Sequence, residues 1–237
     1  GAPGFIKSGV LQNVNTIWAM HVDPNLPLGT ISLTDGWVNA QSVKLDWKIR
    51  GISGHSARPE MAKNPIPVSS RLIQEVQAIA DRIETSENEI KVLAFTGIKS
   101  SGESYNTSPE YTEITATLRT SSENLREELI NQITKFSSQL ATENDLNILF
   151  SAIPGSPPVM NDSLVIEKIK AILKQYPHQK YQIIGDLRSK GGDDFGWYTK
   201  DVPGAMVRFG TSSGKDSPQL HTSLFDVPEE IIPQAVL

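Results

Sequence analysis

The stretch SVKLDWKIR, residues 42–50, alternates apolar and polar side chains along its whole length. Its odd-numbered positions from 43 to 49 are all apolar, whereas lysine, aspartate and arginine occupy the even-numbered positions from 44 to 50. A period of two predicts a β-strand with one buried face and one solvated face. Such a strand needs neighbouring strands and a covering layer, which the following sequence should supply.

The elements expected after residues 42–50 alternate between strands and helices. Apolar residues recur at helical spacing in 67–84 and in 123–140, and either Ser121 or Ser122 can cap the second helix. Strand patterns follow at 91–95, 114–118 and 146–150. The order strand-helix-strand-strand-helix-strand is that of a ferredoxin-like domain, which we place at residues 40–153. We expect its two helices to cover one face of its sheet and polar residues to line the other.

The sequence on both sides of this domain has a mixed α/β pattern. Residues 16–22 form an apolar run that predicts a buried strand, and 23–29, with two prolines and a glycine, predict a loop. Further elements are expected at 30–33, 162–175, 205–209 and 228–237. We therefore predict an α/β domain formed by residues 1–39 and 154–237 and interrupted by the ferredoxin-like domain.

Composition and charge narrow the class of protein. The 237 residues are 38% hydrophobic and 21% charged, as in ordinary globular proteins. A net charge of −5 argues against non-specific nucleic-acid binding, and no apolar run approaches the roughly 18 residues of a membrane-spanning helix. The absence of cysteine excludes disulfides and thiolate metal sites, and it fits the reducing cytoplasm, where we expect the protein. Any metal must be held by His, Asp or Glu.

The four histidines differ in their surroundings. His21 ends the expected strand 16–22, where it could be a metal ligand or a buried histidine bonded to backbone. His55 lies in a loop of small residues, where it could donate to a developing oxyanion or simply be a surface residue. His221 follows a Gly/Ser-rich stretch, and its spacing alone favours a solvated loop. His178, in a polar loop, has no expected role.

The segment KGGDDF, residues 190–195, pairs two glycines with two acids. It could form a turn that opens a helix, with the acids near the positive end of the helix dipole. The backbone N–H groups of Gly191 and Gly192 would then suit a substrate carboxylate. On this motif alone, a plain turn is the favoured explanation.

Taken together, several segments resemble the M20 metallopeptidase family, and particularly its N-acyl-amino-acid amidohydrolase branch. They occur in the order of the family and at about its spacing across the whole chain. The segments are AMHVDPNLPLGTI (19–31), SGHSARP (53–59), GGDDF (191–195), VPGA (202–205), FGT (209–211), LH (220–221), FD (225–226) and EE (229–230). Hippurate hydrolases and auxin-conjugate hydrolases belong to the branch with a histidine at the position of His21.

This resemblance implies a catalytic domain with two divalent metal ions, zinc or manganese, and an inserted lid that forms a homodimer. It implies that His21 and His221 are metal ligands. It also implies that His55, on the ferredoxin-like lid, polarises the scissile carbonyl in the partner subunit. Asn106 and Arg119 match lid positions that help to hold the substrate, and Gly191 and Gly192 would line its carboxylate pocket. The implied substrate is a small N-acyl amino acid or a short peptide, with no nucleic-acid or membrane partner.

The sequence departs from the family in ways that matter for activity. The His-x-Asp motif and the Glu-Glu pair of the family, which supply the remaining metal ligands and the general base, are expected upstream of Gly1. We therefore expect this chain to be a fragment that is inactive alone. Ser53, Asp193, Ser223 and the pair Thr107-Ser108 also differ from the usual residues, which leaves substrate preference open. A carboxypeptidase or dipeptidase, or a non-catalytic dimerisation module, remain alternatives to the amidohydrolase.

Overall fold

The computed structural model describes residues 1–175, 182–214 and 217–236 of the chain. The residues divide into two compact units. Unit 1 comprises Gly1–Ala40 and Ser156–Leu237, and unit 2 comprises the continuous segment Gln41–Gly155.

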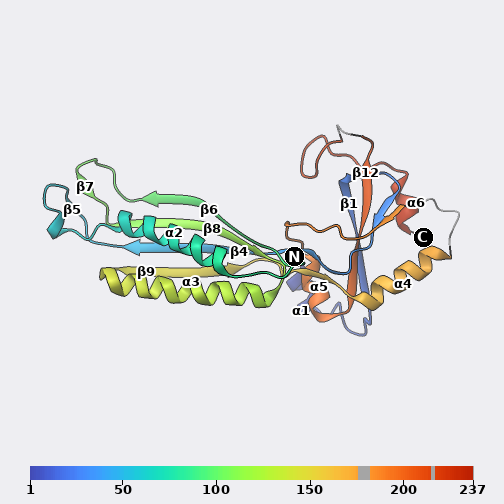
Figure 1. Ribbon diagram of the computed structural model, residues 1–237. Coiled ribbons are helices and arrows are strands. Elements are labelled where there is room, and N and C mark those ends of the chain that lie inside the picture. Colours follow the sequence, from blue (N-terminus) through green and yellow to red (C-terminus); the bar gives the residue numbers. More distant parts are fainter. Residues whose placement is uncertain (176–181, 215–216, 237) are drawn as a thin grey trace. The chain divides into compact units, whose positions relative to one another are not determined.

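Unit 2 is a four-stranded antiparallel sheet with two helices along one face (Figure 1). Its strands lie in the order β6-β8-β4-β9. The elements of this sheet and its helices are, in chain order, β4 (Gln41–Arg50), α2 (Pro65–Arg82), β6 (Lys91–Ser100), β8 (Tyr111–Thr120), α3 (Glu123–Asn144) and β9 (Asn147–Pro154). This strand-helix-strand-strand-helix-strand order confirms the predicted ferredoxin-like arrangement.

The period of two in β4 builds the core of unit 2. The odd-numbered side chains of β4 are buried, and they pack against apolar residues of α2, α3 and β8 such as Leu72, Leu129 and Ile114. The opposite face carries polar pairs, including Lys48 with Glu113 at 2.8 Å. The expected division into a covered face and a polar face is therefore present.

The predicted helices of unit 2 begin at side-chain caps. The Asn64 carboxamide oxygen accepts from the N–H of Ile66, and Pro65 occupies the first position of α2. The Ser122 hydroxyl accepts from the N–H of Leu125 at the start of α3. Ser122, and not Ser121, is therefore the cap.

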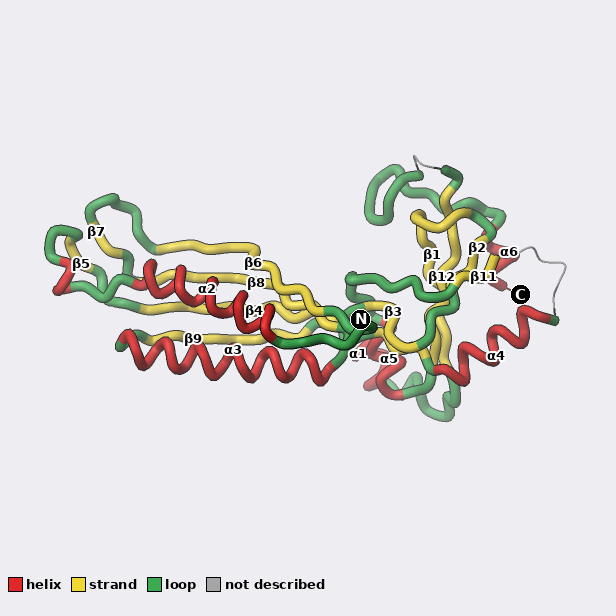
Figure 2. Tube along the Cα trace, in the orientation of Figure 1, coloured by secondary structure: helices red, strands yellow, loops and turns green. Residues whose placement is uncertain are grey.

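One end of unit 2 is a tip made mostly of loop (Figure 2). It contains the short antiparallel pair β5 (Gly54–His55) and β7 (Thr107–Ser108), together with the 3-10 helix η1 (Pro59–Met61). This tip joins the end of β4 to the start of α2, and the end of β6 to the start of β8.

Unit 1 is a mixed sheet in the order β1-β12-β2-β11, with helices on both faces. Strand β1 is parallel to β12, β12 is antiparallel to β2, and β2 is parallel to β11. The elements of unit 1 are α1 (Ala2–Lys7), β1 (Ile17–Pro27), β2 (Thr30–Ser32), β3 (Gly36–Asn39), β10 (Val159–Asn161), α4 (Ser163–Lys174), β11 (Gln182–Ile184), α5 (Phe195–Asp201), β12 (Gly204–Ser212) and α6 (Ile231–Val236). Strands β3 and β10 form a separate antiparallel pair.

Alternation along β12 divides the core of unit 1 between the two faces. Ala205, Val207 and Phe209 pack with residues of α4 and with Ile231 of α6. Met206, which points the other way, packs with Phe195 of α5 and with residues of β3 and β10. We call the second side the α5 face.

Two expectations for the first strand are wrong. Residues 16–22 were expected to be buried, but Trp18 is 54% exposed and Met20 is 47% exposed. The reason is that β1 lies at the edge of the described sheet, with β12 as its neighbour. The segment 23–29 was expected to be a loop, but β1 continues to Pro27 through an irregularity between Asp23 and Pro27. His21 consequently lies inside the strand and does not end it.

No helix in the described part of the chain combines the length and apolarity needed to cross a membrane.

Candidate active site

Alternation along β1 places His21 and Asp23 on the α5 face of the unit 1 sheet. Ile17 and Ala19 pack in the core of that face, so the side chains two and four residues beyond Ala19 point the same way. His21 is paired in register with Arg208 of β12, whose side chain also lies on this face. A titratable cluster therefore forms on one side of two adjacent strands.

The His21 ring is held by the backbone next to it. Its Nδ1 lies 2.7 Å from the carbonyl oxygen of Val22. Because a carbonyl oxygen can only accept, Nδ1 carries a proton, and in the neutral tautomer with this bond the lone pair is on Nε2. A neutral imidazole with Nδ1–H bonded to a carbonyl is the usual arrangement of a histidine that ligates a metal through Nε2.

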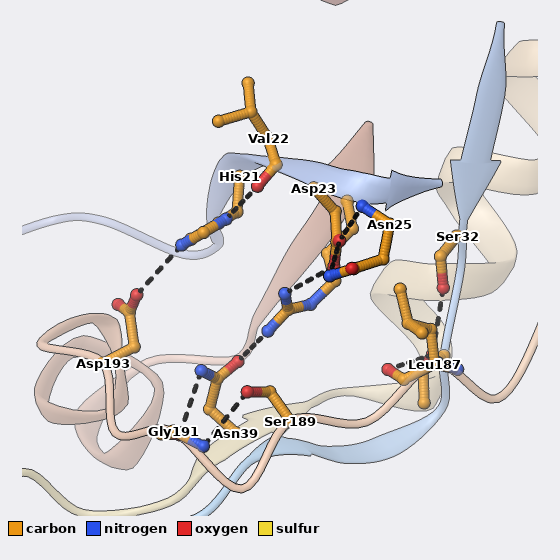
Figure 3. Close-up of polar contacts among 12 residues, drawn as sticks. His21, Val22, Asp23, Asn25, Ser32, Asn39, Leu187, Ser189, Gly191 and Asp193 are labelled. Carbon is orange, nitrogen blue, oxygen red and sulfur yellow. Dashed lines mark hydrogen bonds and ion pairs between the residues drawn. The ribbon is translucent and has the colours of Figure 1, made fainter. Parts of the chain in front are cut away.

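The segment 189–195 approaches His21 from the start of α5 (Figure 3). The Asp193 Oδ2 atom lies 3.8 Å from His21 Nε2, and both side chains are about a quarter exposed (24% and 29%). The other Asp193 oxygen accepts from the N–H of Phe195 at 2.8 Å, which fixes the carboxylate at the helix start. A histidine and a carboxylate thus share an accessible position.

A second, buried link lies beneath this contact (Figure 3). Arg208 donates from Nη1 to Asp23 Oδ2 at 3.1 Å and from Nη2 to Asn39 Oδ1 at 2.7 Å. Asn39 in turn donates from Nδ2 to the carbonyl oxygen of Gly191 at 3.1 Å. This link is buried, because Asp23, Asn39 and Arg208 are only 6%, 4% and 5% exposed. Sequence reasoning missed Asn39 and Arg208, because nothing local to either residue signals the link.

The glycine pair expected to bind a carboxylate is partly engaged. The N–H of Gly191 donates to Ser189 Oγ at 3.0 Å. Within the described residues, none of the hydrogen bonds uses the N–H of Gly192, and this residue is exposed. Of the two predicted donors, Gly192 is the one whose N–H is available to a ligand.

His221 is exposed and has a left-handed backbone, with φ of 64°. In the described part of the chain, no hydrogen bond or ion pair joins His221 to His21. His178 lies outside the described residues, so its expected lack of a role is not addressed by the structure.

The two lid residues His55 and Asn106 lie close together at the tip of unit 2. His55 pairs with Thr107 between β5 and β7, and the N–H of Ser56 donates to the carbonyl oxygen of Asn106 at 2.8 Å. The N–H of Ala57 donates to His55 Nδ1 at 3.1 Å, so the ring proton is on Nε2. His55 is exposed and therefore presents an N–H donor to solvent.

Arg119 lies far from this tip within unit 2. It is paired with Ser42 and Val92 near the end of β8, whereas Tyr111 at the start of β8 is paired with Arg50, which leads into the tip. Eight residues of extended chain separate positions 111 and 119, which corresponds to about 27 Å. Unit 2 therefore does not bring Arg119 together with His55 and Asn106.

The described residues fit part of a metal site. The Nε2 lone pair of His21 and the Asp193 carboxylate are suitable donors for zinc or manganese. However, among residues 1–175, 182–214 and 217–236 no group of three or more His, Asp or Glu side chains is placed to hold a metal ion.

The opposite face of the unit 1 sheet has a pocket of a different kind. It has a volume of about 340 Å³ and is lined by apolar residues including Trp18, Ile172 and Phe209. Lys168 is the only charged residue among those that line it. The polar chemistry of unit 1 is thus concentrated on the α5 face.

Comparisons with known proteins find a matching family model and related hydrolases. Residues 38–145 match the M20_dimer model, described as a peptidase dimerisation domain. N-acetylcysteine deacetylase of Bacillus subtilis (strain 168) is 28% identical over 98% of this chain and 59% of its own length. IAA-amino acid hydrolase ILR1-like 5 of Arabidopsis thaliana is 27% identical over 98% of this chain and 54% of its own length.

A solved structure is similar to this chain over the residues of both units. The Bacillus subtilis YXEP protein, a dinuclear metal binding peptidase from the M20 family, superposes with a TM-score of 0.80 at 25% identity. The match covers 99% of this chain and 58% of that protein. This chain therefore spans less than two thirds of the length of each of these relatives.

Proposed function

Since the chain belongs to the M20 peptidase family, we propose that the whole protein is a metal-dependent hydrolase that cleaves the amide bond of N-acyl amino acids. The observation that carries the proposal is the geometry of His21. Its Nδ1–H is fixed on the Val22 carbonyl, and its Nε2 faces Asp193 at a partly exposed position. The names of a deacetylase and of an amino acid conjugate hydrolase among the relatives support an acylated amino acid as the substrate.

The metal site of the proposal consists of two divalent ions, zinc or manganese, with His21 and His221 among their ligands. The related Bacillus subtilis protein is a dinuclear metal binding peptidase, which supports this number of ions. When bound, such ions polarise an amide carbonyl and lower the pKa of a bound water. The Val22 carbonyl keeps the His21 lone pair directed outward for the metal.

The remaining assigned residues bind and orient the substrate. His55, with its proton on Nε2, donates to the carbonyl oxygen of the substrate in the partner subunit of a homodimer. Asn106 and Arg119 hold the acylated amino acid, and the Gly191-Gly192 turn receives its carboxylate, chiefly through the N–H of Gly192. Unit 2 is the dimerisation domain of the homodimer. The expected compartment is the cytoplasm.

The test is a substrate panel on the whole protein. N-acetyl, N-benzoyl and indole-acyl amino acids are incubated with added manganese or zinc, with and without a chelator, and the released amino acid is quantified. We expect chelator-sensitive release. His21→Ala and His221→Ala should each reduce it by more than about 100-fold, the upper range for losing a residue that only supports a metal ligand. His178→Ala, which removes a histidine with no assigned role, is the matched control and should retain activity.

A peptidase is the second candidate, because the related Bacillus subtilis structure is described as a peptidase. Dipeptides belong in the same panel for this reason. Faster cleavage of dipeptides than of acyl amino acids would replace the amidohydrolase by a dipeptidase or carboxypeptidase. Release from neither class by a metal-loaded, folded dimer would leave a non-catalytic dimerisation module.

A further inference from the structure

Arg208 is a buried charged residue that the proposed chemistry does not use. It is 5% exposed, and its guanidinium group bonds two different residues, Asp23 and Asn39. Its third donor, the Nε–H, is buried without a partner in the described part of the chain. A group that leaves a buried donor unpaired is a poor choice for stability alone, because each unpaired donor carries a desolvation cost.

The contacts of Arg208 close a ring around the candidate site. The ring runs from His21 along β1 to Asp23, across Arg208 and Asn39 to Gly191, and along the backbone to Asp193, which faces His21 (Figure 3). Strand β1 and the segment 189–193 are thus connected twice. The partly exposed connection, between His21 and Asp193, is a 3.8 Å contact that is too long for a hydrogen bond. The buried connection consists of three hydrogen bonds between 2.7 and 3.1 Å.

We propose that Arg208 is a positioning residue that holds the Gly191–Asp193 turn at a fixed distance from His21. The inference rests on the proposed function in one respect. It takes His21 as a metal ligand and the Gly191–Asp193 turn as the part of the same site that binds the substrate carboxylate. The ring itself follows from the contacts of unit 1.

The guanidinium group is chemically suited to this role. It is planar, so its two Nη donors reach acceptors on two separate elements in one fixed geometry, whereas a lysine offers a single compact ammonium group. Both acceptors are oriented by further bonds. Asp23 Oδ1 accepts from the backbone and side-chain N–H groups of Asn25 at 2.9 and 3.0 Å, which leaves Oδ2 for Arg208. Asn39 accepts through Oδ1 and can therefore direct only its Nδ2 to Gly191.

A buried ion pair could instead serve stability, and the two roles predict different behaviour. Replacing both members of a buried pair by uncharged groups is often neutral for stability, whereas removing one member leaves a buried charge. The informative variant is therefore Asp23→Asn together with Arg208→Met. The asparagine keeps an acceptor for Asn25, and methionine fills much of the arginine stem without reaching Asn39.

The first measurement is amide hydrogen exchange of the segment 189–193 in the whole protein, with thermal unfolding measured beside it. We expect the double variant to unfold close to the wild-type temperature but to exchange faster in this segment, where the N–H of Gly191 is bonded to Ser189. Arg208→Lys, which keeps a charge for Asp23 but not the fixed pair of donors, should also exchange faster. Wild-type exchange in a folded double variant would overturn the proposal.

The second measurement is the split between KM and kcat on an N-acyl amino acid. We expect KM to rise about 10- to 100-fold in the double variant, with a smaller change in kcat. This is the range found when residues that orient the binding side chains of a site are lost. Unchanged KM together with unchanged exchange would show that Arg208 has only a structural role.

The matched control is Asn161→Ala. Asn161 is 4% exposed and bonds Thr34 and Met206 in unit 1, but it does not touch the ring. It should lower the unfolding temperature without changing exchange in 189–193 or KM. If the wild-type protein hydrolyses nothing in the panel, the proposed function fails, whereas the exchange comparison still decides the role of Arg208.

Discussion

At the scale of single residues, Gly51 marks a place where two backbones approach too closely for a side chain. A Cβ atom at this position would lie against the carbonyl oxygen of Lys63. The N–H of Gly51 also donates to the backbone carbonyl oxygen of Glu110 at 2.7 Å, and the next residue, Ile52, forms an antiparallel β-bridge with Lys63. The approach of these segments fixes the base of the tip that carries His55.

We therefore expect Gly51→Ala to destabilise unit 2 by about 1–3 kcal/mol, the usual cost of overpacking. Gly97→Ala is the matched control, since the nearest atom to its Cβ would be Thr115 Cβ at 3.9 Å, an ordinary contact. Urea-induced unfolding measured by circular dichroism compares the two variants. Equal stability of both would contradict the close approach seen at Gly51.

A buried charge gives a second prediction at this scale. Arg208→Met alone leaves the Asp23 side chain at 6% exposure without its partner, and removing one member of a buried ion pair typically costs about 3–5 kcal/mol. We expect the single variant to be much less stable than the double variant with Asp23→Asn. Thermal unfolding of the two proteins measures the difference, and a single variant as stable as the double one would be the contrary result.

At the scale of secondary-structure elements, β4 presents two chemically different faces. On the covered face, Trp47 stacks on Phe150 with ring centroids 4.9 Å apart, and its indole N–H donates to Ser137 Oγ of α3 at 3.1 Å. On the open face, the neighbouring Lys48 pairs with Glu113 and lies 4.1 Å from the centre of the Tyr111 ring.

Substitutions at these two adjacent positions should therefore have unequal effects. Trp47→Ala should cost about 3–5 kcal/mol, because it leaves a large cavity between the sheet and α3. Lys48→Ala should cost at most about 1 kcal/mol, since partly exposed ion pairs contribute little. Chemical unfolding of both variants measures the contrast, and similar losses would mean that the two faces are not distinguished as described.

The start of α3 provides a pH-dependent element. Glu89 accepts hydrogen bonds from Ser122 Oγ, Ser86 Oγ and the N–H of Ser86, and these bonds, with that of Ser122 first, hold its pKa below the ordinary value of 4.5. A lowered carboxyl pKa stabilises the fold above the unfolded-state pKa. That stabilisation is lost as the pH falls through the lowered pKa.

Wild type should therefore be more stable than Glu89→Gln at pH 7, and the difference should shrink as the solution is acidified below pH 4.5. Unfolding midpoints of the two proteins between pH 7 and pH 3 test this. A difference that does not change with pH would rule out the carboxylate as its source.

At the scale of the whole molecule, the two units differ in how the chain forms them. Unit 2 is one continuous segment, Gln41–Gly155, with its own buried core, whereas unit 1 is assembled from two distant segments. A contiguous segment with a closed set of strand and helix contacts has the properties of an independently folding domain.

We expect residues 41–155, produced alone, to fold and to form a dimer. Trp47 is the only tryptophan in this segment, so its fluorescence reports the unfolding of the isolated unit directly. Sedimentation measures the mass of the assembly. If the segment is a monomer that unfolds cooperatively, unit 2 does not form the dimer by itself. If the segment is unfolded, unit 2 needs unit 1 in order to fold.

Much of the fold was predictable because its signals are local. The alternation in 42–50 and the helical spacing in 67–84 and 123–140 are properties of neighbouring residues, and they predict the elements of unit 2 within a few positions. Strand 16–22 shows where this reasoning fails. Its apolar composition favours burial, but exposure depends on which strands lie beside it, and β1 lies at an edge of the described sheet.

The candidate site, too, could be predicted from the sequence only in part. The sequence by itself pointed to the tip around His55, to His21 and to the turn at 190–195 through the resemblance of an ordered set of segments to a known family, because each motif alone had a non-functional explanation. Only the tertiary structure decided that Asp23, Arg208 and Asn39 meet beneath His21 and this turn in unit 1, since Asp23 and Arg208 are 185 positions apart and Arg208 and Asn39 are 169 apart. Their contact depends on the parallel register of β1 with β12, which pairs His21 with Arg208. That register is set by the packing of the whole sheet, and no short stretch of sequence encodes it.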